Sequence, residues 1–331
     1  MNPDRSAATR SLVAGGCCFL LCIVLGLAPW WLERASLLRA VEFAYYIALA
    51  QMWNLLAGYA GLMSIGQQMF VGIGAYVLYA MVIKLGWGVL PALLLAGSAA
   101  LVIALPAALL LFRLRGAQFA IGSWVLAESV MLLVTRSEDL GGASGLSLPA
   151  TAVRAMAASA DERIQLIWWL ALLLAIGSTL LVFLWLRSRQ GLALTALRDN
   201  ETAAAGLGVD TRRVKFAVYL AVAGMSGLIG ALIFLNKLRI SPGAAFSMSD
   251  WTASVIFIVV IGGIGSIEGP LLGALIFFAL REVFAAYGAW YQILLGATAI
   301  LVMIKAPRGV WGLLSARWGW SWLSVRRLLK N

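Results

Sequence analysis

Residues Gly191–Lys215 read GLALTALRDNETAAAGLGVDTRRVK and form a charged segment within a chain that is otherwise strongly apolar. Apolar runs flank this segment on both sides, at Ile164–Leu186 and Val214–Leu235. Each run has the roughly 20 residues that a helix needs to cross a bilayer. A short connection would be enough between two such helices, whereas this segment is alanine-rich and carries arginines near both ends. It therefore predicts a small hydrophilic helical module on one face of a membrane, suited to binding a partner.

The apolar pattern continues outward from this segment along the chain. Hydrophobic residues make up 63% of the 331 residues and charged residues only 12%, which excludes a soluble globular domain. Backbone groups inside a bilayer must be satisfied within each segment, so every span is expected to be a helix. The sequence predicts an all-α polytopic integral membrane protein with about ten transmembrane helices: Leu12–Trp31, Leu37–Leu56, Leu62–Ile83, Val89–Phe112, Gln118–Val134, Ile164–Leu186, Val214–Leu235, Trp251–Gly265, Pro270–Phe284 and Trp290–Ile304.

The basic residues predict the orientation of these helices. With both termini in the cytoplasm and ten crossings, 16 of the 25 Lys and Arg residues fall on cytoplasmic segments. This agrees with the positive-inside rule and places the charged segment on the cytoplasmic face. The net charge of +11 then reflects topology and anionic lipid rather than nucleic-acid binding.

The chain lacks the residues that several kinds of catalytic site require. It has no histidine, which excludes the zinc-protease motif and histidine-based acid–base catalysis. None of its five lysines follows a glycine, so it has no Walker A loop. We expect no enzymatic activity, and no cofactor or metal bound by this chain. If ATP drives it, the motor is a separate subunit.

Two halves of the chain look related. Asn54–Tyr76 precedes Trp87–Ala92 in the first half, and Ser241–Gly263 precedes Glu268–Ala274 in the second. If helices two to five correspond to helices seven to ten, the halves enter the membrane from opposite sides, as in the inverted repeats of transporters. The expected division of the chain is an N-terminal segment with the first helix (1–36), a main membrane domain (37–313) with its cytoplasmic loop at 187–215, and a basic aromatic cytoplasmic tail (314–331).

Polar residues within the predicted spans are candidates for a transport path, because an intramembrane polar or charged group is costly unless it has a role. The alternative interpretation is hydrogen bonding between helices. Small residues at helical spacing instead favour close helix packing. The candidate path residues are Gln51, Asn54, Ser64, Gln67, Gln68 and Glu128, and the candidate packing residues are Gly265, Gly269 and Gly273.

Several short motifs follow one another in order: Trp53–Gly61, Ser64–Gly66, Phe70–Tyr76, Arg113–Gly116, Phe119–Ile121, Gly141–Gly142, Gly145–Leu146, Ala196–Glu201, Ser241–Pro242, Gly262–Ser266, Gly269–Pro270 and Pro307–Gly309. This ordered set resembles the LivM-type permeases, which are membrane subunits of ATP-binding-cassette importers for branched-chain amino acids. The resemblance covers roughly residues 37–313. It implies a bacterial inner-membrane location and three kinds of partner: a second homologous permease, two cytoplasmic ATPase subunits that use ATP and magnesium, and a periplasmic solute-binding protein.

The resemblance also implies a role for the charged segment, which looks like the ATPase-docking segment of importer permeases. Asp199 or Asn200 can cap a short helix there, and Gly206 or Gly208 can end it. The residues implied to couple the chain to the ATPase are Arg198, Asp199, Asn200, Glu201, Ala204 and Gly206.

The expected function is therefore import of branched-chain or related amino acids delivered by the binding protein. Two departures from the family pattern leave the solute open. Gly66–Gln68 reads Gly-Gln-Gln where many relatives have Gly-His, and Gly141–Gly145 reads Gly-Gly-Ala-Ser-Gly where Gly-Gly-Pro-Asn-Gly is common. Aromatic amino acids, amides and urea-like solutes are alternatives, as is a proton-coupled secondary transporter that uses Glu128.

Overall fold

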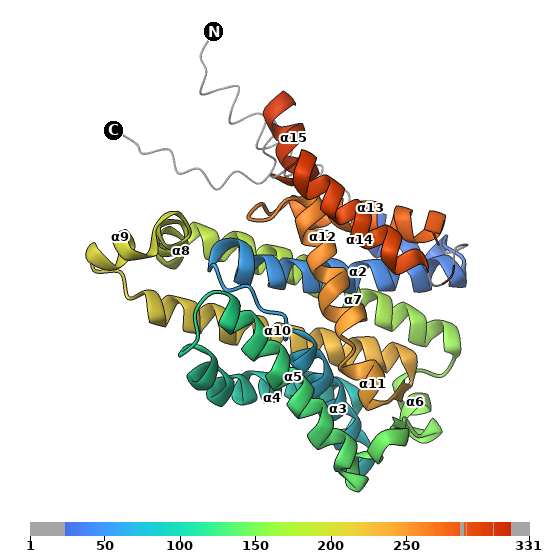
Figure 1. Cartoon of the computed structure of the whole chain (residues 1–331). Helices are drawn as coiled ribbons and strands as arrows, with labels where there is room; N and C mark the ends of the chain where they lie inside the picture. Colours follow the sequence, from blue (N-terminus) through green and yellow to red (C-terminus); the bar gives the residue numbers. More distant parts are fainter. Residues whose placement is uncertain (1–23, 285–287, 289, 307, 319–331) are drawn as a thin grey trace.

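The computed structural model describes residues 24–284, 288, 290–306 and 308–318. Within them the protein is a bundle of α-helices with one small two-stranded sheet (Figure 1). The predicted first span, Leu12–Trp31, lies mostly outside the described residues, as does most of the predicted tail, 314–331.

The described helices and strands follow one another in this order: η1 (Ala28–Trp30), α2 (Arg34–Asn54), the π-helix η2 (Leu55–Tyr59), α3 (Gln68–Lys84), α4 (Val89–Leu111), α5 (Ala117–Arg136), η3 (Glu138–Leu140), η4 (Gly142–Ser144), β1 (Leu146–Ser147), α6 (Ala150–Met156), α7 (Ala160–Arg187), α8 (Arg189–Asp199), α9 (Glu201–Gly206), α10 (Thr211–Lys237), β2 (Arg239–Ile240), α11 (Pro242–Ala245), the π-helix η5 (Met248–Ala253), α12 (Ser254–Gly262), α13 (Gly269–Phe284), α14 (Trp290–Lys305) and α15 (Gly309–Trp318).

Several of these helices have the length and composition of membrane spans. Six described segments are long and apolar enough to cross a bilayer: Val89–Leu111, Ala117–Arg136, Ala160–Arg187, Thr211–Lys237, Pro242–Gly262 and Ile293–Arg317. The shorter α3 is also apolar. The chain is therefore an all-α, multi-pass membrane protein, which confirms that part of the prediction, while the count of about ten spans stays a prediction.

Two helical hairpins pack on two central helices. The α3–α4 hairpin packs against α10, and the α12–α13 hairpin packs against α2, whose other side contacts α7. The contact between α3 and α10 depends on glycine: a Cβ built on Gly74 would lie 2.0 Å from the Gly227 carbonyl oxygen. Such backbone contact increases van der Waals packing, which holds helices together in lipid. Of the six candidate spans, α10 is the most buried and α5 the least.

The predicted span Leu62–Ile83 begins too early. Residues 61–67 are not helical, and α3 starts only at Gln68. The Trp53 Nε1–H donates to the Ser64 carbonyl oxygen at 2.8 Å, and the Ile65 N–H donates to Ser123 Oγ at 3.0 Å. Irregular backbone at membrane depth is tolerated when it is buried in protein, and these bonds supply partners that a helix would have given.

The sheet joins the two halves at the end of the bundle opposite α8. β1 pairs with β2 in antiparallel register, with Leu146 opposite Ile240. Gly145, just before β1, has a φ of +76°, and a Cβ there would lie 1.9 Å from the Ile240 carbonyl oxygen. Only glycine fits this close approach.

Candidate functional site

A polar network holds the loop between α12 and α13, residues 263–268, against the end of α2. Asn54 is fully buried on the last turn of α2. Its Nδ2 donates to the Ser266 carbonyl oxygen and its Oδ1 accepts from the Gly265 N–H, both at 2.8 Å. One turn earlier, Gln51 Nε2 donates to a second carbonyl oxygen of the loop, that of Ile267, at 2.8 Å. Two amide side chains thus satisfy loop backbone groups that have no helical partner.

Two neighbouring glutamines join the start of α3 to α2, α10 and η5. Gln67 Nε2 donates to Ser226 Oγ at 3.1 Å and to the Leu49 carbonyl oxygen at 3.3 Å. The Gln68 N–H donates to Thr252 Oγ1 at 3.3 Å, and the Thr252 hydroxyl donates to the Gln68 side-chain oxygen. Gln67 Oε1 and Gln68 Nε2 are buried and have no hydrogen-bond partner within the described part of the chain. These two atoms keep unused hydrogen-bonding capacity at the centre of the protein.

The structure brings five of the six candidate path residues together and separates the sixth. The five buried residues around the end of α2 are Gln51, Asn54, Ser64, Gln67 and Gln68. Glu128 lies instead on α5, where it is half-buried and its carboxylate accepts from Trp124 Nε1–H at 3.2 Å. Most hydrogen bonds of the clustered residues join two different segments of the chain. This agrees with the alternative interpretation, in which these polar residues hold helices together. Their role in a transport path stays a prediction.

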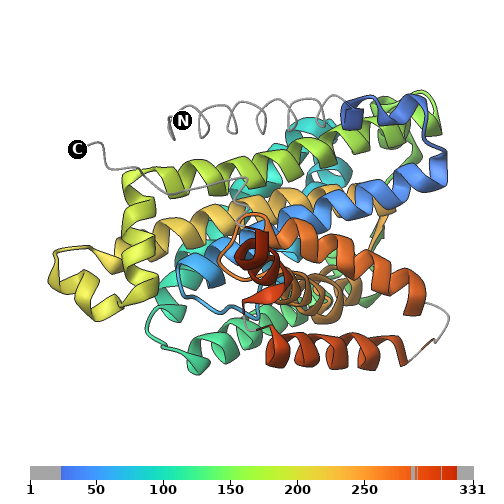
Figure 2. The same cartoon turned by 90° about the horizontal axis from the view of Figure 1, so that it is seen from above.

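The charged segment folds as the two short helices α8 and α9 at one end of the bundle (Figures 1 and 2). Asn200 caps α9, because its side chain accepts from the Ala203 N–H at 3.0 Å. Gly208, with a φ of +84°, follows α9 in the left-handed conformation that ends many helices. Lys215 Nζ lies 2.6 Å from Glu201 Oε1 and ties α9 to the start of α10. We call α8 and α9 the cytoplasmic helix pair, after the side of the membrane that the sequence predicts for them; this side stays a prediction.

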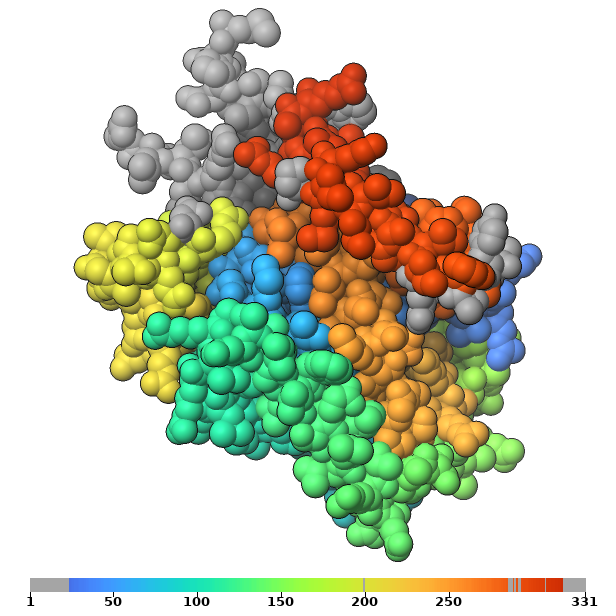
Figure 3. All heavy atoms as spheres, in the orientation of Figure 1, coloured from blue at the N-terminus to red at the C-terminus, as the bar shows by residue number. Residues whose placement is uncertain are grey.

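The cytoplasmic helix pair has one buried face and one open face. The residues packed against the bundle are Leu194, Leu197 and Ala204. On the open face, the Leu207 side chain is 84% exposed and Leu192 is 54% exposed. Gly206 also faces open space, since a Cβ built on it meets nothing within 4 Å. Figure 3 shows the yellow segment at the molecular surface, where a partner can reach these residues.

The α8 helix also contacts the loop that Asn54 holds. A Cβ built on Gly265 would lie 3.4 Å from Arg198 Nη1 and 3.3 Å from the Gly58 carbonyl oxygen. Gly58 belongs to the π-helix η2, which α8 contacts as well. The cytoplasmic helix pair, the loop and the buried polar network therefore form one continuous set of contacts.

Of the three glycines predicted to pack, two lie on α13. A Cβ on Gly269 would lie 2.3 Å from the Gly263 carbonyl oxygen, and one on Gly273 would lie 1.9 Å from the Ile258 carbonyl oxygen of α12. Gly265 is a correction to the predicted helical face, since it lies in the loop before α13 with a φ of +75°. The chain turns there between the two helices, and that turn requires the conformation glycine adopts freely.

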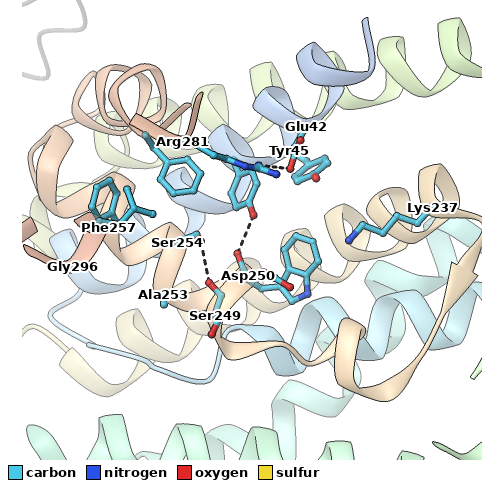
Figure 4. Close-up of a pocket in the computed structure, with 14 residues that line it drawn as sticks. Glu42, Tyr45, Lys237, Ser249, Asp250, Ala253, Ser254, Phe257, Arg281 and Gly296 are labelled. Atoms are coloured by element: carbon cyan, nitrogen blue, oxygen red, sulfur yellow. Dashed lines mark hydrogen bonds and ion pairs between the residues drawn. The ribbon is translucent and has the colours of Figure 1, made fainter. Parts of the chain in front are cut away.

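A cavity of about 440 Å³ lies toward the end of the bundle opposite the cytoplasmic helix pair. Figure 4 shows the residues that line it. Arg281 Nη1 of α13 lies 2.6 Å from Glu42 Oε1 of α2. Asp250 of η5 and Lys237, the last residue of α10, also line it. Its aromatic lining residues are Tyr45, Tyr46, Trp251, Phe257 and Phe277. We call this site the charged cavity.

The charged cavity was not predicted as a site. Three of its four charged residues stand near the end of a helix, where a charge normally reaches the membrane interface, and Glu42 lies about two turns inside α2. The sequence did contain one indication of this site: two acids and two bases lie near the ends of predicted spans on the same side of the membrane. Only the tertiary structure shows that these ends converge.

Comparison with known proteins identifies the family. Residues 37–303 match the family described as branched-chain amino acid transport system / permease component. The chain belongs to this family. It is 29% identical to the high-affinity branched-chain amino acid transport system permease protein LivM of Escherichia coli (strain K12), over 87% of this chain and 73% of that relative. The permease is also 30% identical to LivH of Salmonella typhimurium, over 45% of this chain and 47% of LivH.

A second LivM, from Salmonella typhimurium, is 28% identical over 85% of the permease and 71% of its own length. No solved structure matches the permease significantly. Members of this family are membrane subunits of transporters rather than enzymes, and ATP hydrolysis in such systems takes place on separate subunits. The predicted family and class of function are thereby confirmed.

Proposed function

We propose that this permease is one of two homologous membrane subunits of an ATP-binding-cassette importer in a bacterial inner membrane. It would carry branched-chain or related amino acids that a periplasmic binding protein delivers. Similarity to both LivM and LivH, two permease proteins of branched-chain amino acid systems, supports the second permease and the solute class. ATP and magnesium would act on the two ATPase subunits, with no cofactor held by this chain.

The cytoplasmic helix pair carries the proposal. It combines an open face at Gly206 and Leu207 with a contact from Arg198 to the loop that Asn54 holds. A motor subunit bound at the open face could therefore displace the loop and the helices on either side of it as rigid bodies. The residues proposed to take part in this coupling remain Arg198, Asp199, Asn200, Glu201, Ala204 and Gly206.

We also propose that about ten helices cross the membrane, as an inverted repeat of helices two to five and seven to ten. Reciprocal packing supports the repeat: the α3–α4 hairpin of the first half packs on α10 of the second, and the α12–α13 hairpin packs on α2. An exchange of hairpins between halves is the arrangement that a pseudo-two-fold axis in the membrane plane generates.

The test is ATP-driven uptake into vesicles that contain the permease, its partner permease, both ATPase subunits and the loaded binding protein. Gly206→Trp should abolish uptake and ATPase binding, because a Cβ at this position meets nothing within 4 Å, so a large side chain there extends into open space and obstructs a partner. Glu201→Arg should have a similar effect. Gly206→Ala and the charge reversal Arg317→Glu, at an exposed site outside the helix pair, are the matched controls. Wild-type uptake by Gly206→Trp would refute the docking role.

A panel of solutes tests the substrate. Leucine, isoleucine, valine, phenylalanine, short amides and urea are compared with the cognate binding protein present. Uptake of amides or urea but no amino acid would refute the amino-acid assignment. Uptake driven by a pH gradient in vesicles that contain this chain without ATPase subunits would favour the secondary-transporter alternative.

A further inference from the structure

The charged cavity carries groups of both signs on the side of the membrane where solute would enter. Lys237 ends α10, and the cytoplasmic helix pair adjoins the start of that helix. Because α10 has 27 residues and a helix rises 1.5 Å per residue, the two ends lie about 40 Å apart. With the helix pair in the cytoplasm, the charged cavity belongs to the extracytoplasmic half. Charged groups there are expected to face water or protein rather than lipid.

Two of its four charges are already used. Arg281 and Glu42 form an ion pair at 2.6 Å, with side chains that are 41% and 27% exposed. Their charges therefore compensate each other in the absence of any ligand.

The other two charged groups, Lys237 and Asp250, attract each other but form no direct ion pair within the described residues. Lys237 Nζ lies 4.8 Å from the Trp251 ring centroid and 5.3 Å from that of Phe234, which positions the ammonium by cation–π attraction. In the described part of the chain, neither the Lys237 ammonium nor the Asp250 carboxylate forms an ion pair. Figure 4 shows both side chains at the same cavity, from α10 and η5. Asp250 itself is fixed through its backbone, since Tyr46 Oη donates to its carbonyl oxygen at 3.2 Å.

The rest of the lining is largely aromatic and aliphatic, with two serines. Trp251 and Phe277 are about 1% exposed, and Tyr45 and Phe257 are also buried. A volume of about 440 Å³ falls within the range of small-molecule sites, which combine apolar walls with a few fixed polar groups. A ligand that satisfies Lys237 and Asp250 together needs one carboxylate, one ammonium and an apolar body.

We infer that the charged cavity binds a free α-amino acid as a zwitterion, with the ligand carboxylate at Lys237, its ammonium at Asp250 and an apolar side chain against the aromatic residues. This inference rests on the proposed function and names the site within the permease where the solute is held. The cavity also adjoins the buried polar network, because Thr252 follows Trp251 directly and bonds to Gln68. A solute leaving the cavity would therefore meet the polar atoms at the centre of the protein.

The experiment is protection of a thiol in the cavity wall, measured on the assembled importer in lipid nanodiscs without binding protein. Ser249 is exposed and lines the cavity, so Ser249→Cys is introduced after the three native cysteines are replaced by alanine. Leucine should slow labelling of this thiol by a neutral maleimide. A thiol at Ser147→Cys, on β1 outside the cavity, should not be protected.

Ligand analogues and charge variants then test each contact. The leucine analogues 4-methylpentanoate, which lacks the ammonium, and 3-methylbutylamine, which lacks the carboxylate, should each need about tenfold or more concentration for half-protection. Lys237→Met and Asp250→Asn should each weaken protection by leucine to a similar degree. The matched controls are Lys84→Met and Asp139→Asn, which remove an exposed ion pair outside the cavity and should leave protection unchanged.

The outcomes separate this inference from the proposed function. If the wild-type importer takes up leucine but leucine gives no protection, only this inference is wrong. Equal protection by leucine and both analogues, or equal shifts in the control variants, would also overturn it. If the wild-type importer takes up no amino acid, the proposed function falls and the inference falls with it.

Discussion

Replacement of Asn54 by leucine tests whether a single amide holds the loop that the cytoplasmic helix pair contacts. Asn54 is fully buried, and leucine has a similar size, so packing should largely be retained. The change removes two hydrogen bonds of 2.8 Å, to the Ser266 carbonyl oxygen and from the Gly265 N–H. Both loop groups would then lose their side-chain partner.

The expected cost follows from these two bonds. An intramolecular hydrogen bond contributes about 1 kcal/mol net, and bonds between membrane helices average about 0.6 kcal/mol. The loop groups are only partly buried, so water can replace part of what is lost. We therefore expect Asn54→Leu to lower the free energy of unfolding by roughly 1–2 kcal/mol. Because Arg198 rests beside Gly265, ATP-driven uptake should fall more than this stability loss alone would cause.

The assay combines thermal unfolding of the purified complex with ATP-driven uptake at a temperature well below the transition. Asn236→Leu is the matched control. Asn236 is half-buried at the C-terminal end of α10 and makes no side-chain hydrogen bond within the described residues. Asn54→Leu should lower both the unfolding temperature and the uptake per ATP hydrolysed, while Asn236→Leu changes neither appreciably. Equal behaviour of the two variants would refute the assignment of Asn54 as the residue that fixes the loop.

Three further predictions concern packing and charge. Gly273→Ala should destabilise the permease by about 1–3 kcal/mol, since the added Cβ would lie 1.9 Å from a carbonyl oxygen of α12, whereas Gly177→Ala, which meets nothing within 4 Å, should leave thermal stability unchanged or raised. Glu128→Gln should retain uptake within about twofold in the vesicle assay, because an amide can still accept the hydrogen bond that this half-buried carboxylate receives on α5. Lys84→Met should change the free energy of unfolding by less than about 1 kcal/mol, because its ion pair with Asp139 is exposed to solvent.

The apolar runs were sufficient to predict most helices, because a helix in a membrane is built from apolar side chains whether it faces lipid or other helices. They could not show where a helix is interrupted. The sequence places residues 62–67 in a span, yet the structure shows them in irregular form. The Trp53 indole of α2 donates to the Ser64 carbonyl oxygen, and the Ile65 N–H donates to Ser123 of α5. Hydropathy takes no account of such partners.

The caps of the cytoplasmic helix pair were readable from sequence, since Asn200 and Gly208 act within a few residues of the backbone that they satisfy. The charged cavity was not readable in this way. Glu42 and Arg281 are 239 residues apart, and neither charge taken alone indicates a cavity. The clustered glutamines were found as polar residues, but only the structure shows which of their atoms are bonded.

The two ends of the permease are connected by the same pair of helices. On α2, Asn54 and Gln51 contact the loop 263–268, while Glu42, three turns earlier, lines the charged cavity. On the other side of that loop, α12 leads back to η5 and Asp250. A packed helix tends to move as a unit, so in the proposed mechanism displacement of the loop by the cytoplasmic helix pair would also shift the acidic groups of the cavity. Binding of solute and binding of the motor would then influence each other through α2 and α12, with equal coupling in both directions.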